Sequence, residues 1–181
     1  ITGAGSGIGR ASAYLFAKEG SKLVVADIND AGGEETVATI KADDGEAIFV
    51  HTDVSMASEV EHLVKVTKDK FGKIDVLFNN AGMFLGVTAV EIIDESLWDQ
   101  IYAINVRGIF LAIKYTVPEM KKAGSGVIIN TASIAGVRPR PYLSAYASSK
   151  GAVIALTKAL ALELAPDNIR VNCISPGPVE T

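Results

Sequence analysis

The stretch Ile1-Thr2-Gly3-Ala4-Gly5-Ser6-Gly7-Ile8-Gly9 decides the fold. Its spacing, Gly3-x-x-x-Gly7-x-Gly9, predicts a tight turn that leads into a helix, because glycine lets the backbone bend sharply. Such a turn brings backbone N–H groups and a helix N-terminus against a phosphate. Glycine-rich turns also cap helices for structural reasons alone, and that alternative stays open for the turn by itself. A P-loop is excluded because no Gly-Lys-Ser/Thr ending follows.

Beyond the turn, short apolar runs alternate with longer segments of helical period, which is typical of βαβ units. The expected strands are Lys22–Ala26, Ala47–His51, Val76–Asn79, Val127–Thr131 and Arg170–Ser175. The expected helices are Gly7–Glu19, Ala31–Ala42, Glu59–Phe71, Leu97–Lys122 and Ala145–Leu164. Most strand runs are apolar on both faces, which suits a parallel sheet covered by helices on two sides. The sequence predicts one α/β domain over residues 1–181, a Rossmann-type doubly wound parallel sheet.

Turn and cap residues refine these boundaries. Ser58 and Glu61 resemble a capping box, and Gly20, Gly72 and Gly124 stand where helices are expected to stop. Pro118 is expected to kink or shorten the end of its helix. Almost no strand residues precede the glycine turn, and the chain closes just after a strand. We therefore expect the first strand and a C-terminal segment of the domain to be lacking from this sequence.

Composition narrows the classes of function. Seventeen Lys and Arg against 21 Asp and Glu give a net charge of −4, without a basic run that would attract nucleic acid or an anionic membrane. No apolar run reaches the roughly 20 residues that span a bilayer. A single cysteine, Cys173, and two histidines argue against an internal disulfide and a structural metal site. A reducing compartment, the cytoplasm, is expected.

Asp27 ends the first complete strand, close to the roughly 20 residues after the glycine turn at which a carboxylate can accept hydrogen bonds from a ribose. The same carboxylate would repel a 2′-phosphate, and neither Ser6 nor Ile28 supplies a cation to attract one. The pattern favours NAD over NADP. A helix-capping role for Asp27 is the alternative, since Asn29 and Asp30 follow it.

Three further residues indicate proton chemistry. Tyr146 and Lys150 are four residues apart on an expected helix, so their side chains share one face. A nearby ammonium would stabilise a tyrosine phenolate and lower the pKa of its hydroxyl from near 10. Ser133 follows a strand at the sheet edge where ligands of open α/β sheets bind. In isolation this trio is no stronger than chance, and only its combination with a dinucleotide turn is informative.

Together these motifs resemble the classical short-chain dehydrogenase/reductases over essentially the whole chain. The resemblance rests on Thr2-Gly3-x-x-x-Gly7-Ile8-Gly9, Asn79-Asn80-Ala81-Gly82, Asn105, Ser133, Tyr146-x-x-x-Lys150 and Pro176-Gly177, in the family's order and at about its spacings. It implies that Tyr146 is the catalytic acid/base and Ser133 holds the substrate oxygen. It also implies that Lys150 lowers the tyrosine pKa and that Asn105 keeps a proton relay in place. The cofactor-binding residues it implies are Gly3, Ser6, Gly7, Ile8, Gly9, Asp27, Asp53, Val54, Asn80, Ala81, Gly82, Tyr146, Lys150, Pro176, Gly177 and Thr181.

The resemblance implies an NAD-dependent oxidoreductase that moves a hydride between a secondary alcohol or ketone and nicotinamide, without a metal. An NADPH-dependent 3-oxoacyl-carrier-protein reductase is the alternative, and a catalytically silent dinucleotide-binding subunit is less favoured. By the same resemblance, a homodimer or homotetramer is expected. The arginines of Arg138-Pro139-Arg140-Pro141 are interpreted as solvated charges of a rim loop, with contact to an anionic substrate as the less favoured alternative. No role is assigned to His51 or His62, and Cys173 is expected to be a small buried residue.

Overall fold

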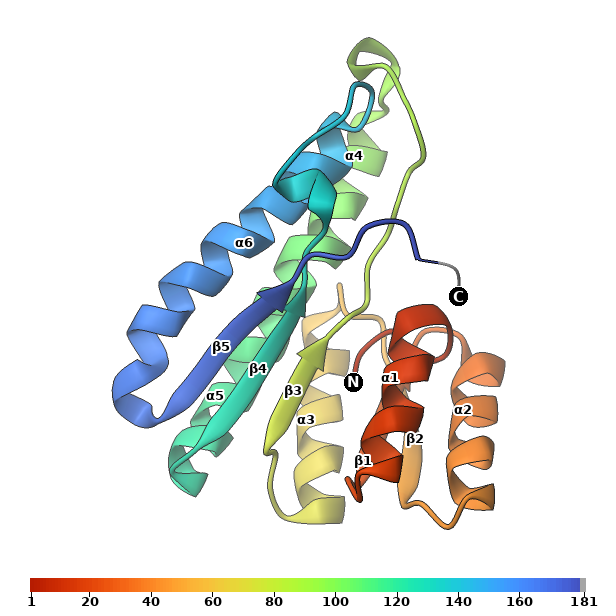
Figure 1. The fold of residues 1–181 in the computed structure, drawn as a ribbon, viewed down its shortest axis with the longest axis vertical. Coiled ribbons are helices and arrows are strands. Elements are labelled where there is room, and N and C mark those ends of the chain that lie inside the picture. The colour runs from red at the N-terminus through yellow and green to blue at the C-terminus, as the bar shows by residue number, and fades with distance from the viewer. Residues whose placement is uncertain (180–181) are drawn as a thin grey trace.

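A parallel sheet forms the centre of residues 1–179, the part of the chain that the computed structural model describes (Figure 1). Its strands are β1 (Leu23–Asp27), β2 (Ala47–His51), β3 (Val76–Asn79), β4 (Gly126–Thr131) and β5 (Ile169–Ile174). β2 pairs with β1, and β3, β4 and β5 pair in that order. Thr2 joins the two groups through parallel bridges to Ala26 and Asn79. All five predicted strands are therefore confirmed, with ends within one residue of those expected.

The helices are α1 (Gly7–Lys18), α2 (Asp30–Ala42), α3 (Ala57–Phe71), α4 (Glu95–Tyr102), α5 (Gly108–Ala123) and α6 (Ser144–Leu164). One prediction was wrong in kind. The single helix expected over Leu97–Lys122 is two α-helices separated by a wider, π-helical turn at Ala103–Arg107. Such turns insert into helices where a side chain must be re-aimed, and apolar period alone does not reveal them.

One smaller expectation was also wrong, and a second was wrong in one of its two alternatives. α3 begins after Met56, so Ser58 lies inside its first turn and the predicted capping box does not form. Pro118 lies inside α5, which continues to Ala123, so it does not shorten the helix. The stop signals were right at Gly72 and Gly124, which end α3 and α5 in the left-handed conformation that glycine adopts without strain.

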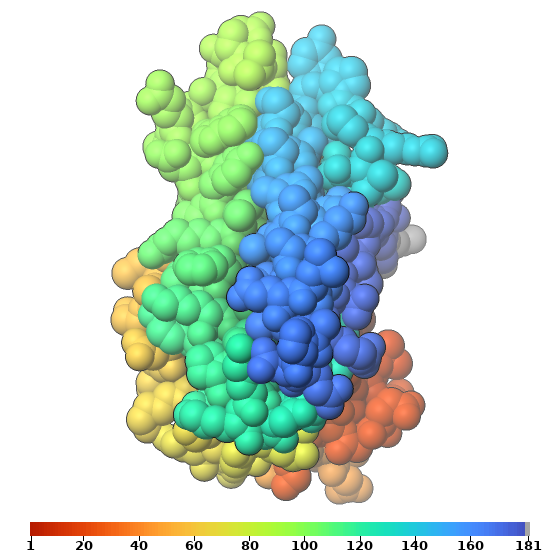
Figure 2. Space-filling view, turned by 90° about the vertical axis from the view of Figure 1, so that its left-hand side faces the viewer, coloured from red at the N-terminus to blue at the C-terminus, as the bar shows by residue number. Residues whose placement is uncertain are grey.

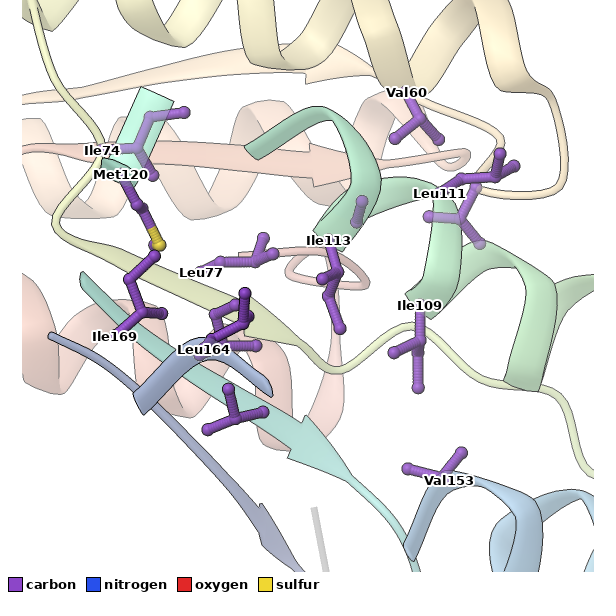
Figure 3. Packing of buried hydrophobic residues seen from close by; sticks show 14 of the residues in the cluster. Val60, Ile74, Leu77, Ile109, Leu111, Ile113, Met120, Val153, Leu164 and Ile169 are labelled. Carbon is purple, nitrogen blue, oxygen red and sulfur yellow. The ribbon is translucent and has the colours of Figure 1, made fainter. Parts of the chain in front are cut away.

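Side chains of β1 alternate between two covered faces. Leu23 and Val25 of β1 pack with α1 and α2, whereas Val24 and Ala26 pack on the other face against α3. The largest core cluster lies on this second face, where α3, α5 and α6 cover β3, β4 and β5 (Figure 3). This layering places the carboxyl ends of all the strands at one edge of the sheet.

The outer surface of that second layer is formed by neighbouring helices. Figure 2 shows α6 beside the segment of α4 and α5 over one face of the molecule.

Cys173 is partly rather than fully buried and packs against the core, so its expected burial is only partly met. No helix within residues 1–179 is long and apolar enough to cross a membrane.

Candidate active site

A cleft of about 800 Å³ opens at the carboxyl ends of β1, β3 and β4. Thirteen of the predicted site residues line it: Gly3, Ser6, Gly7, Ile8, Asp27, Asp53, Val54, Asn80, Ala81, Gly82, Tyr146, Lys150 and Gly177. Gly9, Asn105, Ser133 and Pro176 are not among its lining residues. Thr181 lies outside the described residues. The topology thus gathers segments from both ends of the chain around one cavity.

The glycine turn presents backbone to this cleft. α1 begins after Ser6, whose side chain makes no capping hydrogen bond to the helix. The amide N–H groups at a helix start have no acceptor within the helix, so they are available to an anion in the cleft. Gly9 supports the turn from behind, because a Cβ built on it would lie 2.0 Å from the carbonyl oxygen of Gly3. Position 9 therefore requires glycine because of this close packing, not because the residue contacts the cleft.

Asp27 is fixed at the edge of the cleft by two backbone groups. Its Oδ2 accepts a hydrogen bond from Gly5 N at 2.7 Å, and its Oδ1 accepts one from Asn29 N at 2.9 Å. A carboxylate has about four acceptor positions, so each oxygen keeps a lone pair for a further donor. The arrangement can bind two neighbouring hydroxyl groups.

Asn80 ties the segment after β3 to the glycine turn. Its Nδ2 donates to the carbonyl oxygens of Thr2, at 3.3 Å, and Gly3, at 3.1 Å. The backbone N–H groups of Asn80 and Ala81 both donate to Thr2 Oγ1 at 3.1 Å. Two segments that are nearly 80 residues apart therefore form one rigid floor of the cleft.

Lys150 is a buried cation beside Tyr146. Only 2% of Lys150 is exposed, and its Nζ donates to the carbonyl oxygen of Thr131 at 2.7 Å. Burial lowers the pKa of Lys150 from 10.5 to about 8, because the charged form loses its hydration. The ammonium lies 5.8 Å from the centre of the Tyr146 ring, and the Phe84 ring packs edge-on against that ring at 5.0 Å. Tyr146 thus lies between the ring of Phe84 and the positive charge of Lys150.

Asn105 lies in the π-helical turn and is completely buried. Its Oδ1 accepts from Met83 N at 2.7 Å, and its Nδ2 donates to Met83 O at 2.9 Å and to Ser149 Oγ at 3.1 Å. Ser149 in turn donates to the carbonyl oxygen of Tyr146 at 2.8 Å. A Cβ on Gly82 would lie 3.3 Å from both Asn105 Oδ1 and Lys150 Nζ, so the absence of a side chain there lets both groups approach. Asn105 links the helix of the tyrosine to the segment after β3.

Ser133 faces a second, adjoining cavity of about 310 Å³. Its Oγ accepts a hydrogen bond from Ala135 N at 3.2 Å, which leaves the hydroxyl proton free to be donated. Tyr146, Phe84 and Gly177 line both this cavity and the large cleft. Tyr146 thus lies where the two cavities join, and Ser133 lines the smaller cavity with it, so a reacting group in that cavity can be near both residues.

Several lining residues were missed by sequence reasoning. They are Ile28, Thr52, Met83, Phe84, Ile104, Thr131 and Val179. Met83 and Phe84 follow Asn79-Asn80-Ala81-Gly82, and large apolar side chains directly after such a turn were a usable signal. Ser149 was missed too, because its contact with Asn105 depends on the π-helical turn.

Comparison with known proteins assigns the chain to a family. The family model for short chain dehydrogenase matches residues 1–181, the whole chain. The chain belongs to the short-chain dehydrogenase family. Members of this family are oxidoreductases that bind a nicotinamide dinucleotide, so the resemblance inferred from the motifs is confirmed.

Individual relatives agree with this assignment. An uncharacterized oxidoreductase of Thermotoga maritima is 44% identical over 181 residues, which are 100% of this chain and 71% of that protein. The structure of NAD⁺-bound xylitol dehydrogenase matches with a TM-score of 0.95 and 42% identity, over 97% of this chain and 68% of that one. A 3-ketoacyl-(acyl-carrier-protein) reductase from Brucella melitensis complexed with NADH matches with a TM-score of 0.94 and 41% identity, over 98% and 73%. The chain spans between 66% and 73% of the lengths of the curated relatives.

Proposed function

We propose that this protein is an NAD-dependent oxidoreductase that interconverts a secondary alcohol and a ketone. The observation that carries the proposal is the position of Tyr146, which lies at the junction of the two cavities beside the buried ammonium of Lys150. A hydroxyl so placed can exchange a proton with a substrate in the small cavity while a dinucleotide occupies the large one.

The residues of the large cleft suit a nicotinamide dinucleotide. The uncapped start of α1 offers N–H groups to its phosphates, and the two free lone pairs of Asp27 suit the hydroxyls of its adenosine ribose. Asp53 and Val54 would contact its adenine, and Gly82 and Gly177 its central and nicotinamide portions. When bound, the cofactor supplies hydride acceptance or donation, and no metal is needed.

The side chains then divide the proton chemistry. The Lys150 ammonium stabilises the phenolate form of Tyr146, which removes the proton of the alcohol in oxidation and returns one to the oxygen in reduction. Ser133 donates its hydroxyl hydrogen to the same substrate oxygen and stabilises the charge that develops there. Asn105 holds the backbone of Met83 and, through Ser149, the helix that carries Tyr146. In this way it keeps the groups of the proton relay in place.

Asp27 supports NAD over NADP, because its carboxylate would face a 2′-phosphate at the cleft edge. The principal alternative is a 3-oxoacyl-carrier-protein reductase, which the resemblance to the Brucella melitensis reductase favours. That structure contains NADH, so the cofactor alone does not separate the two activities.

The decisive experiment replaces Tyr146 with Phe in the full-length protein. We expect turnover of small ketones with NADH to fall by about 1,000-fold or more, because the proton donor is lost, while NADH binding followed by nicotinamide fluorescence is retained. Tyr142→Phe is the matched control, because Tyr142 is exposed and lines neither cavity. Turnover that survives in Tyr146→Phe would show that another group is the acid/base.

We also propose that residues 1–181 form one nucleotide-binding domain of a cytoplasmic homodimer or homotetramer. Exposed apolar side chains on three helices support self-association, among them Leu97 on α4, Phe110 on α5 and Leu162 on α6. The single cysteine supports a reducing compartment.

A further inference from the structure

The small cavity carries two positive charges that the proposed chemistry does not use. Arg138 and Arg140 line it together with Ser133 and Tyr146. The remaining lining residues are uncharged: Phe84, Ile134, Ala135, Leu143, Gly177 and Pro178. Arg138 and Arg140 are therefore the only charged residues that line this cavity within the described part of the chain, and both are exposed.

Neither arginine forms an ion pair with a carboxylate of residues 1–179. Within residues 1–179, no carboxylate oxygen lies within 4.0 Å of the nitrogen atoms of Arg138 or Arg140, although Arg10 forms such an ion pair with Glu35. The chain as a whole is acidic, with a net charge of −4. Two exposed arginines that have no ion pair within residues 1–179 give an otherwise uncharged cavity a local positive potential in an acidic protein.

The backbone that holds the arginines is restrained. Arg138 N donates to the carbonyl oxygen of Ile134 at 2.7 Å, and prolines on both sides of Arg140 fix the neighbouring backbone dihedrals. The loop is also tied to the segment after β3, because Thr88 N donates to Tyr142 O at 2.8 Å. Figure 1 shows this segment between β4 and α6 lying beside the segment that follows β3. Restraint lowers the entropy cost of binding an anion there.

We propose that Arg138 and Arg140 bind a carboxylate of the substrate, so that the protein acts on a small oxo acid and the corresponding hydroxy acid. This inference rests on the proposed function, because Ser133 and Tyr146 must hold the reacting oxygen in the same cavity. Guanidinium groups match carboxylates through paired, charge-assisted hydrogen bonds. A volume of about 310 Å³ is at the lower end for ligand pockets, which fits a substrate of a few carbon atoms.

Matched pairs of acids and their methyl esters test the proposal. Pyruvate, acetoacetate and levulinate are compared with methyl pyruvate, methyl acetoacetate and methyl levulinate as substrates of the full-length protein at saturating NADH. The acid and the ester of a pair have the same ketone, so only the negative charge differs substantially. We expect one acid to exceed its ester in kcat/KM by about 10- to 100-fold, with most of the difference in KM.

Removal of the charges should cancel this preference. In Arg138→Gln/Arg140→Gln, kcat/KM for the acid is expected to fall by about 10- to 100-fold, while that for the ester stays within about threefold. Arg138→Lys/Arg140→Lys should recover part of the loss. Lys41→Gln, on the exposed side of α2, is the matched control for a lost positive charge remote from the cavity. Unchanged NADH binding shows that the variants are folded.

The two proposals fail in different ways. Reduction of esters as efficiently as acids, or equal losses for both in the glutamine variant, would overturn the carboxylate assignment and leave the oxidoreductase intact. No reduction of any ketone with NADH or NADPH would overturn both. A preference for the acid that survives in the glutamine variant would also refute the arginine site.

Discussion

The two ends of the large cleft differ in the groups that form them, which are mainly backbone at one end and buried polar side chains at the other. Around the glycine turn, the cleft is bounded mainly by backbone, and packing leaves no room for side chains: a Cβ on Gly9 would lie 2.0 Å from Gly3 O. Around Tyr146, the surroundings are buried polar side chains, with Asn105, Ser149 and Lys150 each no more than 2% exposed. One end is defined by the absence of side chains and the other by their chemistry.

This difference has an energetic consequence. The glycine turn needs only close packing, and the turn itself adds no titratable group. The catalytic end keeps an ammonium in a buried position, where its pKa falls to about 8 and its charged form destabilises the fold. Substitutions at the two ends should therefore fail in distinguishable ways.

The largest effect is expected at the backbone end, from Gly9→Ala. The methyl group cannot fit against Gly3 O, so α1 or the turn must shift. We expect a loss of about 3 kcal/mol in the free energy of unfolding, at the upper end for overpacking. NADH affinity should also fall by about 100-fold, because hydrogen bonds to the phosphates are misaligned. Denaturant unfolding and fluorescence titration of the full-length protein measure both quantities.

Gly151→Ala is the matched control for this substitution. Gly151 also lies in a helix, but the nearest atom to a Cβ there is Gly136 O at 3.7 Å, an ordinary contact. Stability should be unchanged or slightly higher, since alanine favours a helix. If Gly9→Ala bound NADH as tightly as the parent, the turn would not be limited by this contact.

The backbone end was also the more predictable one from sequence. Glycine spacing directly reports where the chain must turn or approach closely, and alternating apolar runs located all the strands. The role of Asp27 was predicted from the number of residues that separate it from the glycine turn in the sequence. The separation of β1 from β3 by Thr2 reflects the strand order of the sheet, which the local pattern does not encode.

The catalytic end was less predictable because its contacts are long-range. Asn105, expected in an ordinary helix, lies in a π-helical turn that brings its amide to Met83 and Ser149. Arg138 and Arg140 were interpreted as solvated charges of a rim loop and are exposed, but nothing local in the sequence shows that they also line the small cavity. The burial of Lys150 depends on the packing of α6 against β4 and could not be inferred from a four-residue spacing.

A substitution of Lys150 probes the energetic side of the comparison. Lys150→Met should abolish turnover yet raise the free energy of unfolding near pH 7.5, since the buried charge is removed. The depressed pKa corresponds to a burial penalty of about 3 kcal/mol. Loss of the hydrogen bond to Thr131 O offsets about 1–3 kcal/mol of that gain. Chemical denaturation without cofactor measures the net difference.

The pH dependence separates the two contributions. The penalty is complete below pH 8, where Lys150 is protonated in both states, and it disappears as pH rises to 10.5, where the unfolded chain also loses the proton. The advantage of Lys150→Met should therefore shrink by about 2 kcal/mol between pH 7.5 and 9.5. Lys158→Met, on the exposed side of α6, is the control. A constant difference across this pH range would show that Lys150 is not destabilised by burial.

The smallest expected effect concerns Asp27, where a charged side chain completes the backbone end. In Asp27→Ala, NADH affinity should fall by about 10-fold, because the ribose hydroxyls lose their acceptor. NADPH affinity should change less or rise, because the carboxylate that faces its 2′-phosphate is gone. The ratio of the two dissociation constants, obtained from parallel fluorescence titrations, should move towards NADPH by about 10- to 100-fold.

Asp30→Ala distinguishes this effect from a general loss of negative charge. Asp30 is exposed three residues further on and pairs with His51 Nδ1 at 2.6 Å, outside the lining of the cleft. Its removal should leave the cofactor ratio unchanged. The hydrogen bonds from Gly5 N and Asn29 N mean that Asp27→Ala also loosens the turn, which would weaken both cofactors equally. A parallel loss for NADH and NADPH would therefore identify Asp27 as a structural cap, whereas a changed ratio requires its contact with the ribose.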